Sequence, residues 1–366
     1  MKTSRNAGFR QVITIVVVTM AIIAGGLLIG QAYRLLLPRS ASVESEYFDQ
    51  LFTFTISIAG MIFLLVEGLL LYSVLRFRRR PGDEEDGPPI HGHTKLEIVW
   101  TVIPAIIVTV LSFYSYDVLK VVDLQYEDIR SWFCGPYLTP GQVLLEPVKG
   151  ERLVVDVIGR QYSWEFVYPN YGGVSSAELH VPVGQIVLLR ITSEDVIHSF
   201  WVPQFRLKKD AIPGMFTEAR FTATQPGTYP VICAELCGLG HSAMRASLVA
   251  ETSEEFETWI SSLVSGEAGD GSSVEVGRRL FVRLGCGACH TLQDAGSAAD
   301  LGPPLDGLAG RAGGRVPGLS AQEYVRQAVV EPQAYILNGY LDVMPRYGDR
   351  LTDEELSALV EYLLHE

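Results

Sequence analysis

The chain has 366 residues, 48% of them hydrophobic, and a formal net charge of −13 at pH 7. This length allows two or three domains of ordinary size, and the acidic balance argues against non-specific nucleic-acid binding, which needs a basic surface. Five cysteines, four of them in two close pairs, are too few for a disulfide-stapled scaffold and favour metal or haem chemistry.

Three apolar stretches, residues 11–33, 51–75 and 98–116, dominate the first third of the chain. Each is long enough for a membrane-spanning helix, which needs about 20 predominantly apolar residues. Four of the five residues 76–80 are arginine, and basic loops stay in the cytoplasm. We therefore expect a transmembrane helical hairpin within residues 48–122 of a multi-pass protein of the bacterial cell membrane, with all later residues on the extracytoplasmic side.

Residues 1–38 leave two interpretations open. Lys2, Arg5 and Arg10 flank the first apolar stretch, which fits either a retained transmembrane helix or a cleaved signal peptide. The length of the stretch and the lack of a clear cleavage site favour the helix. The expected position of the later domains does not depend on this choice.

Residues 143–262 have the pattern of an all-β domain. Short runs rich in β-branched residues, such as 153–158 and 186–191, alternate with turns that contain glycine, proline and asparagine. Strands at this spacing predict a sandwich or a Greek-key barrel.

The sequence pattern changes after residue 262, from that of strands to that of a linker followed by helices. Residues 263–273 are small and polar and are predicted to be a linker, and residues 274–366 are predicted to be an all-α domain. Ser272 with Glu275, and Thr352 with Glu355, have the spacing of capping boxes at helix starts. The first of these helices is expected to run into Cys286.

The segment from Cys233 to Met244 gathers soft metal ligands. Two thiols, an imidazole and a thioether follow one another at Cys233, Cys237, His241 and Met244. Such donors suit copper better than zinc, for which methionine is an unusual ligand. His198, at the end of a predicted strand, can supply a second imidazole if the loop returns beside that strand.

Two cysteines at this spacing can bridge two copper ions. Each copper then takes one histidine, with Met244 and a backbone carbonyl as weak outer ligands. No coordination position is left open, so fast one-electron transfer is favoured over substrate turnover. The alternative is a structural disulfide between Cys233 and Cys237, which explains neither His241 nor Met244. Cys134 has no partner cysteine nearby in the sequence and is expected to be a buried or free thiol and not a ligand.

The run from Cys286 to His290 has the spacing of a c-type haem attachment site, with thiols at Cys286 and Cys289 and His290 as the proximal ligand. Met344 is the only methionine after this run and is the candidate for the sixth ligand. Histidine–methionine ligation raises the reduction potential of haem, which suits passing electrons onward. The segments 302–305 and 343–347 resemble the haem-edge and distal methionine loops of class I cytochromes c.

Residues 48–262 resemble subunit II of the cytochrome c oxidases, whose copper centre is the binuclear CuA. The resemblance is carried by Glu97-Ile-Val-Trp-Thr-Val-Ile-Pro-Ala, Asp195-Val-Ile-His-Ser-Phe-Trp-Val-Pro, Lys209-Asp-Ala-Ile-Pro-Gly and the copper loop itself.

This resemblance implies a cupredoxin-like Greek-key barrel and a set of copper ligands. By the family pattern the ligands are His198, Cys233, Glu235 through its backbone carbonyl, Cys237, His241 and Met244. The Glu235 side chain is implied to reach a magnesium ion shared with subunit I, since carboxylate oxygen suits that ion.

Three further residues gain candidate roles from the resemblance. Tyr162 and Trp164 lie in the aromatic stretch where electrons enter the family's copper domain. Many members that dock a separate cytochrome c have tryptophan in place of Tyr162, so the usual route is in doubt and a tethered haem donor fits better. Glu97 resembles the mouth of a proton channel leading into subunit I, with a carboxylate at the membrane edge as the alternative.

None of the seven histidines lies in the three apolar stretches. Because oxygen reduction at a haem–copper centre needs histidines inside the membrane, another chain must carry that site. The resemblance implies that electrons pass from a soluble or membrane-bound cytochrome donor to haem c, to CuA and to haem in subunit I, where oxygen is reduced to water with proton pumping. Subunits I and III and the membrane are expected partners, and no nucleic acid is expected.

Two other functions remain open at this point. The chain could be the electron-input subunit of a CuA-type nitric oxide reductase. It could also be a membrane-anchored copper-handling protein that has no catalytic partner.

Overall fold

The computed structural model describes residues 2–79, 82, 92–122, 152–267 and 272–365. Cys134 and residues 143–151, which were predicted to begin the all-β domain, lie outside these residues. The chain divides into two compact units, Met1–Arg39 with Glu46–Val122, and Ser40–Ser45 with Asp123–Glu366.

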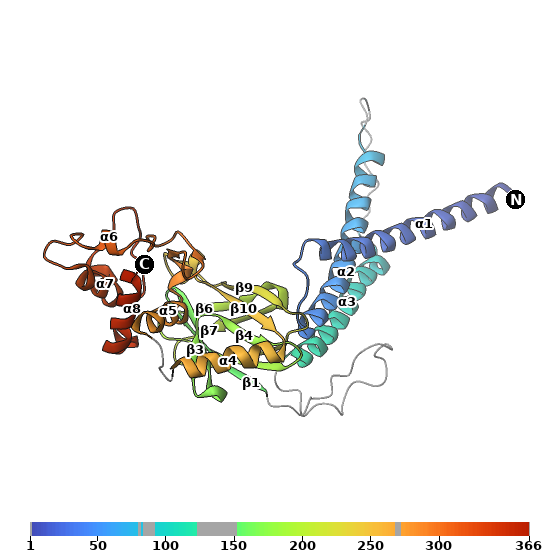
Figure 1. Ribbon diagram of the computed structural model, residues 1–366. Helices are drawn as coiled ribbons and strands as arrows, with labels where there is room; N and C mark the ends of the chain where they lie inside the picture. Colours follow the sequence, from blue (N-terminus) through green and yellow to red (C-terminus); the bar gives the residue numbers. More distant parts are fainter. Residues whose placement is uncertain (1, 80–81, 83–91, 123–151, 268–271, 366) are drawn as a thin grey trace. The chain divides into compact units, whose positions relative to one another are not determined.

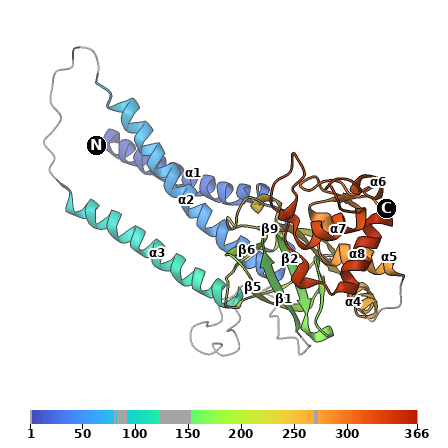
Figure 2. The same cartoon turned by 90° about the vertical axis from the view of Figure 1, so that its left-hand side faces the viewer.

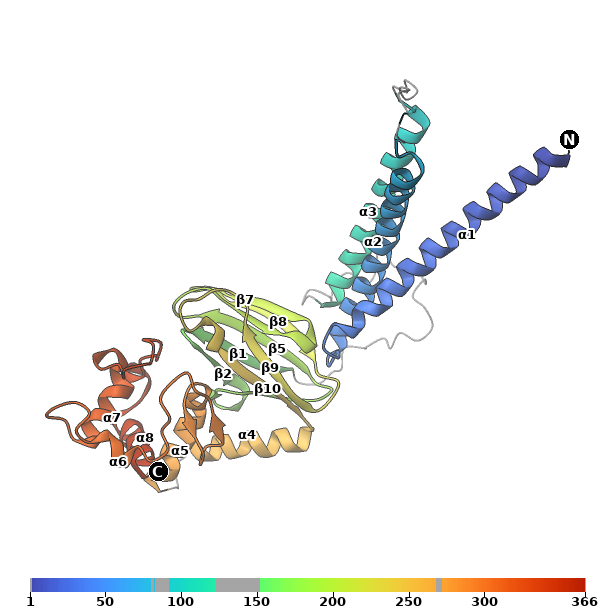
Figure 3. The ribbon, with the colours of Figure 1, turned by 90° about the horizontal axis from the view of Figure 1, so that it is seen from above.

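The first unit is helical. Its helices are α1 (Lys2–Ala32), α2 (Val43–Arg76) and α3 (Thr94–Val122), and all three are long and apolar enough to cross a membrane. The predicted apolar helices are therefore confirmed. The ribbons of α2 and α3 run alongside each other in Figure 3. Phe54 of α2 lies edge-on to Tyr114 of α3, with ring centroids 5.6 Å apart. The Tyr33 hydroxyl, just after α1, donates to the Asp49 carbonyl of α2 over 3.0 Å.

The second unit begins with a β-sandwich, seen in Figure 1. In spatial order, the first sheet contains β3 (Val174–Ser176), β2 (Ser163–Tyr168), β1 (Leu153–Arg160), β5 (Ile186–Ser193) and β8 (Thr217–Thr222). The second contains β4 (Leu179–Pro182), β10 (Arg245–Glu251), β9 (Gly227–Cys233), β6 (His198–Val202) and β7 (Leu207–Ala211). The predicted cupredoxin-like domain is confirmed in this form.

Buried and partly exposed side chains alternate along the strands, and the buried ones form the core of the sandwich. Every second side chain of β1 is buried, and β1 pairs in parallel with β5, whose burial alternates in the same way. Phe166, Leu189, Phe200 and Val231 from the two sheets are fully buried together. Fully burying an apolar side chain of this size stabilises a fold by about 1.5–3 kcal/mol. This packed core gives the strand ends that carry the site a rigid support.

The helical region follows the sandwich in the second unit. It comprises α4 (Ser253–Glu267), α5 (Ser273–Arg283), α6 (Ala309–Ala312), α7 (Ala321–Val330), α8 (Asp353–His365) and the two-stranded ladder β11 (Thr291–Leu292) and β12 (Ser297–Ala298). Short 3₁₀ turns lie at Tyr33–Leu35, Pro169–Tyr171, Pro203–Phe205, His241–Ala243, Cys286–Ala288, Pro332–Ala334 and Gly348–Arg350.

The predicted helix starts are borne out, and one predicted helix end is corrected. The Ser272 hydroxyl accepts from the Glu275 amide over 3.3 Å, and Thr352 and Glu355 cap each other reciprocally. However, α5 stops at Arg283 and does not reach Cys286, because Gly285 adopts a left-handed conformation with φ 70°.

Helices α5 and α8 pack closely, as Figure 2 shows for the helical region. The contact is made at Gly277 of α5. A Cβ atom at this position would lie 2.1 Å from the Ala358 carbonyl oxygen of α8. The approach of the two helices therefore depends on the absence of a side chain at residue 277.

Gly277→Ala should accordingly destabilise the helical region. We expect a loss of about 1–3 kcal/mol, the usual cost of overpacking, measured as a lower unfolding temperature by haem absorbance. Gly310→Ala in α6 is the matched control, because a Cβ there meets nothing within 4 Å. Equal unfolding temperatures for the two variants would contradict the role assigned to Gly277.

Candidate copper and haem sites

The predicted copper ligands are carried by neighbouring strands of the second sheet. His198 begins β6, Cys233 ends β9, and these strands pair antiparallel with Phe200 opposite Cys233. The loop after Cys233 returns to the sheet at β10, where the Cys233 amide donates to the Met244 carbonyl over 3.1 Å. The sheet register thus brings the distant His198 beside the loop.

All six predicted ligand groups come together. The Cys233 and Cys237 sulfurs are 3.9 Å apart, and the Cys233 sulfur lies 3.9 Å from His198 Nδ1 and 3.2 Å from the Glu235 carbonyl oxygen. The Cys237 sulfur lies 3.5 Å from His241 Nδ1 and 3.9 Å from the Met244 sulfur. His198, Cys233 and Cys237 are the group of potential metal ligands found within the described residues.

This donor set fits copper. Two thiols and a thioether are soft donors, and imidazole accompanies them in copper sites. The alternative of a disulfide is not borne out, because Cys233 and Cys237 are both free and their sulfurs lie well beyond the roughly 2.05 Å of an S–S bond.

Asp195 orients the His198 ring. Its carboxylate lies 2.8 Å from His198 Nε2, which leaves Nδ1 directed at the sulfurs, and His198 is fully buried. A carboxylate behind a ligand histidine is a common way to fix its tautomer. Asp195 lies in the sequence motif that contains His198, but its residue type alone does not reveal this role. Its spacing of three residues before a candidate ligand was the available signal.

The two thiols differ in acidity. Burial raises the pKa of Cys233, but hydrogen bonding to His198 and to backbone amides more than offsets this and lowers it to about 7. Burial, followed by repulsion from Cys233, raises the pKa of Cys237 to about 12. Since copper binds thiolate, loading at neutral pH must displace a proton from this pair.

Tyr162 packs directly against the copper loop. A Cβ atom at residue 240 would lie 2.5 Å from ring atom Cδ2 of Tyr162, and one at residue 238 would lie 2.5 Å from its hydroxyl. The neighbouring Gln161 donates from Nε2 to the Cys237 carbonyl over 2.5 Å. Two glycines therefore make room for the tyrosine. Trp164, the second aromatic candidate, is instead buried edge-on to His198.

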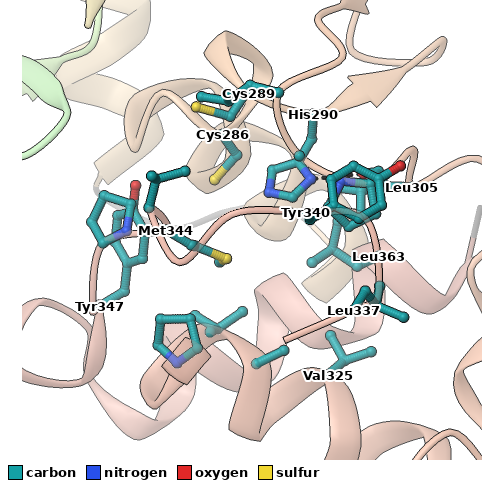
Figure 4. A pocket seen from close by; sticks show the side chains of 18 of the residues that line it. Cys286, Cys289, His290, Leu305, Val325, Leu337, Tyr340, Met344, Tyr347 and Leu363 are labelled. Atoms are coloured by element: carbon teal, nitrogen blue, oxygen red, sulfur yellow. Dashed lines mark hydrogen bonds between the residues drawn. The ribbon is translucent and has the colours of Figure 1, made fainter. Parts of the chain in front are cut away.

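The helical region contains an apolar cavity around the predicted haem ligands (Figure 4). Cys286, Cys289, His290 and Met344 all line it, together with apolar side chains such as Leu305 and Val325. Free thiols, a histidine and a methionine around one apolar cavity fit a covalently bound haem. Tyr162 and Ser163 also line this cavity, although they belong to the sandwich.

His290 is held in the protonation state that iron binding needs. Its Nδ1 lies 2.8 Å from the Pro303 carbonyl oxygen, an acceptor, so Nδ1 carries the proton and Nε2 is available. Burial lowers the pKa of His290, which keeps the imidazole neutral at neutral pH. Gln333 fastens the Met344 loop by donating from Nε2 to the Met344 carbonyl over 3.3 Å.

Glu235 and Glu97 were predicted to have further roles, toward magnesium and protons. The Glu235 side chain is exposed, while its carbonyl faces Cys233. Glu97 accepts from the His93 amide over 3.1 Å at the start of α3. Their predicted roles toward magnesium and protons stay predictions.

Three protein-family models match the chain. The model described as "Cytochrome C oxidase subunit II, transmembrane domain" matches residues 30–118, and its "periplasmic domain" counterpart matches residues 175–251. The model described as "Cytochrome c" matches residues 274–366.

Several curated proteins are similar to this chain. "Cytochrome c oxidase subunit 2" of Thermostichus vulcanus is 42% identical over 254 residues, which cover 61% of this chain and 77% of that protein. Its namesake in Alkalihalophilus pseudofirmus is 30% identical over 314 residues, or 84% of each chain. Among solved structures, the periplasmic domain of subunit II of cytochrome oxidase of Bradyrhizobium japonicum is 31% identical, with 31% of this chain and 94% of that chain covered and a TM-score of 0.30.

Removing one of the two thiols predicted to bridge copper tests the predicted copper site. We expect Cys237→Ser to lower copper from two ions per chain to one or none and to abolish the mixed-valence absorption, because the remaining donors cannot bridge two metals. Metal analysis and visible spectroscopy of the full chain provide the measurement. Cys134→Ser serves as the control and should keep both. Retention of two coppers in Cys237→Ser would refute the ligand assignment.

Proposed function

The chain belongs to the cytochrome c oxidase subunit II family and carries a C-terminal cytochrome c domain, and we propose that it is the electron-input subunit of a haem–copper oxidase. In this proposal electrons pass from a cytochrome donor through haem c and a binuclear CuA centre to haem in subunit I. Oxygen is reduced to water there, with proton pumping. In this proposal the oxygen-reducing site lies on another chain, because none of the seven histidines of this sequence lies in an apolar stretch.

One observation carries this proposal: Tyr162 packs against the copper loop and also lines the haem cavity. A single side chain is therefore in contact with both candidate cofactor sites. Electron tunnelling slows steeply with distance, so such proximity favours exchange between the two sites over substrate chemistry at either one.

A hydrogen bond and the sheet register position the residues of the proposed copper site. Asp195 fixes the ring of His198, and the sheet register fixes Cys233 beside it. Met244 is fully buried, which keeps water from that side of the site. Copper bound by these donors supplies one-electron exchange with little change in ligand positions, because the ligands are already in place.

Four residues that line the cavity of the helical region are proposed to hold the haem. In the proposal Cys286 and Cys289 form the thioether bonds and His290 and Met344 ligate the iron, which the shared cavity of the four residues supports. Haem bound in this way supplies a one-electron carrier whose potential methionine ligation raises. The apolar lining excludes water and so stabilises the less charged, reduced state of the site.

The partners and the location follow from the family as proposals. The three apolar helices and the matched transmembrane family domain support membrane anchoring. We propose that the copper and haem regions lie on the extracytoplasmic side of a bacterial membrane. Subunits I and III would be the partners, with Glu235 contributing to a magnesium site shared with subunit I and Glu97 lying near a proton channel.

The alternative functions are not favoured. The named relatives are oxidase subunits, and a copper-handling protein has no need of the haem attachment run that matches a cytochrome c model. Purification of the chain from its native membranes distinguishes the three functions. We expect a multi-helix haem protein to co-purify, with uptake of oxygen and not of nitric oxide from reduced donor. Isolation of the chain without such a partner would contradict the proposal.

Substitution of the distal ligand tests the haem assignment. Met344→His should keep the haem attached but lower its reduction potential by a sizeable part of the roughly 0.8 V range that axial ligands span. Potentiometric titration of the purified chain measures the shift. Met215→His is the control, because Met215 is exposed in the sandwich, and its haem potential should equal that of the unaltered chain. An unchanged potential in Met344→His would show that another group is the sixth ligand.

A further inference from the structure

An ion pair joins residues 272–365, which contain the candidate haem site and are called the haem-bearing region below, to the sandwich. Arg350 lies in the turn before α8, and its Nη2 donates to Glu165 Oε2 of strand β2 over 3.2 Å. The side chains of both residues are only about one-fifth exposed, at 20% and 21%. Ion pairs on open surfaces contribute little because water and salt screen them, whereas a pair this well covered is screened much less.

Glu165 is shared with a second arginine of the sandwich. Arg160 Nη1 donates to the same Oε2 atom over 2.5 Å, and Arg160 Nη2 donates to Glu194 over 2.6 Å. Burial raises the pKa of Glu165, but Arg160 and then Arg350 outweigh it and hold that pKa below its usual value. The carboxylate is therefore ionised at neutral pH and is held in place to receive Arg350.

Arg350 is also linked to the wall of the haem cavity. Its guanidinium lies over the ring of Tyr347, 5.1 Å from the centroid, and Tyr347 lines the cavity. The Tyr347 hydroxyl donates to the Leu284 carbonyl over 3.3 Å, two residues before Cys286. A displacement of Arg350 would thus reach the segment that binds the haem.

A separate contact supports the same interface. Gly285, which immediately precedes Cys286, packs against the sandwich, and a Cβ there would lie 3.2 Å from the Cβ of Ala177. Tyr162 and Ser163 enter the haem cavity lining a few residues from Glu165. The contact between the two regions is therefore centred on the start of β2.

We propose that Arg350, Glu165 and Arg160 form a docking latch, which seats the haem-bearing region on β2 and keeps Tyr162 in the wall of the haem cavity. The three residues are positioning residues and touch neither candidate cofactor site as ligands. The purpose given to the latch, electron exchange between haem and copper, rests on the proposed function. The docking itself is testable without electron transfer.

A double-mutant cycle on the full chain with both cofactors bound tests the latch. The variants are Arg350→Gln, Glu165→Gln and the two combined, and each of them leaves the Arg160–Glu194 pair intact. Hydrogen exchange of residues 345–352, followed by mass spectrometry, reports docking. Each single variant should exchange roughly tenfold faster than the unaltered chain, the effect expected from loss of a charged hydrogen bond. The double variant should be no faster than Glu165→Gln alone, because that single variant already removes the Arg350–Glu165 pair.

Two further variants distinguish a loss of docking from a general loss of stability. Arg350→Lys should recover most of the protection, since it keeps the charge. Arg326→Gln removes an exposed ion pair to Asp353 within the helical region and should change nothing. Haem-to-copper electron exchange after photoreduction should slow in the same variants that lose protection, with an unchanged haem potential.

The outcomes distinguish the latch from the proposed function. Unaltered exchange in Arg350→Gln, or effects of the two single variants that simply add, would overturn the latch. If the unaltered chain shows no electron exchange between haem and copper while the protection pattern is as expected, the latch stands as a docking device and the proposed function fails.

Discussion

The ring of Tyr162 fills space left by two glycines of the copper loop and borders the haem cavity on the sandwich side. This packing requires that the copper loop, strand β2 and the haem-bearing region keep fixed positions relative to one another. Any side chain at residue 238 or 240 would displace the tyrosine. The two candidate sites are consequently coupled through one residue, and neither can shift far without disturbing the other.

The sandwich makes that coupling possible because it holds the site rigidly. His198 and Cys233 lie at the ends of paired strands, above a core in which Phe166, Phe200 and Val231 are fully buried. Close packing of this kind resists displacement of the ligands when their charge changes. The Gln161 side chain adds a direct tie from the β1–β2 turn to the Cys237 carbonyl. Electron transfer benefits from such rigidity, since less rearrangement accompanies each electron.

Much of this arrangement could be predicted from the sequence. The parts that could not be predicted depend on contacts between residues far apart in the chain. The ligands at 233, 237, 241 and 244 share one loop, so residue type and spacing pointed to a common site. His198 could be joined to them by assuming that the loop returns to its strand. The Arg350–Glu165 pair spans 185 residues and depends on how two folded regions dock, which no local pattern encodes. Helix α5 ends before the residue that the sequence predicts, because Gly285 adopts a left-handed conformation that stops the helix.

The most direct test is flash photoreduction of the haem in the purified full chain, in the absence of any other oxidase subunit and at several protein concentrations. The haem should reoxidise as the copper becomes reduced, with a single rate constant that does not change with protein concentration, because both sites belong to one polypeptide and meet at Tyr162. A rate that rises in proportion to concentration, or a haem that stays reduced beside oxidised copper of higher potential, would contradict the account.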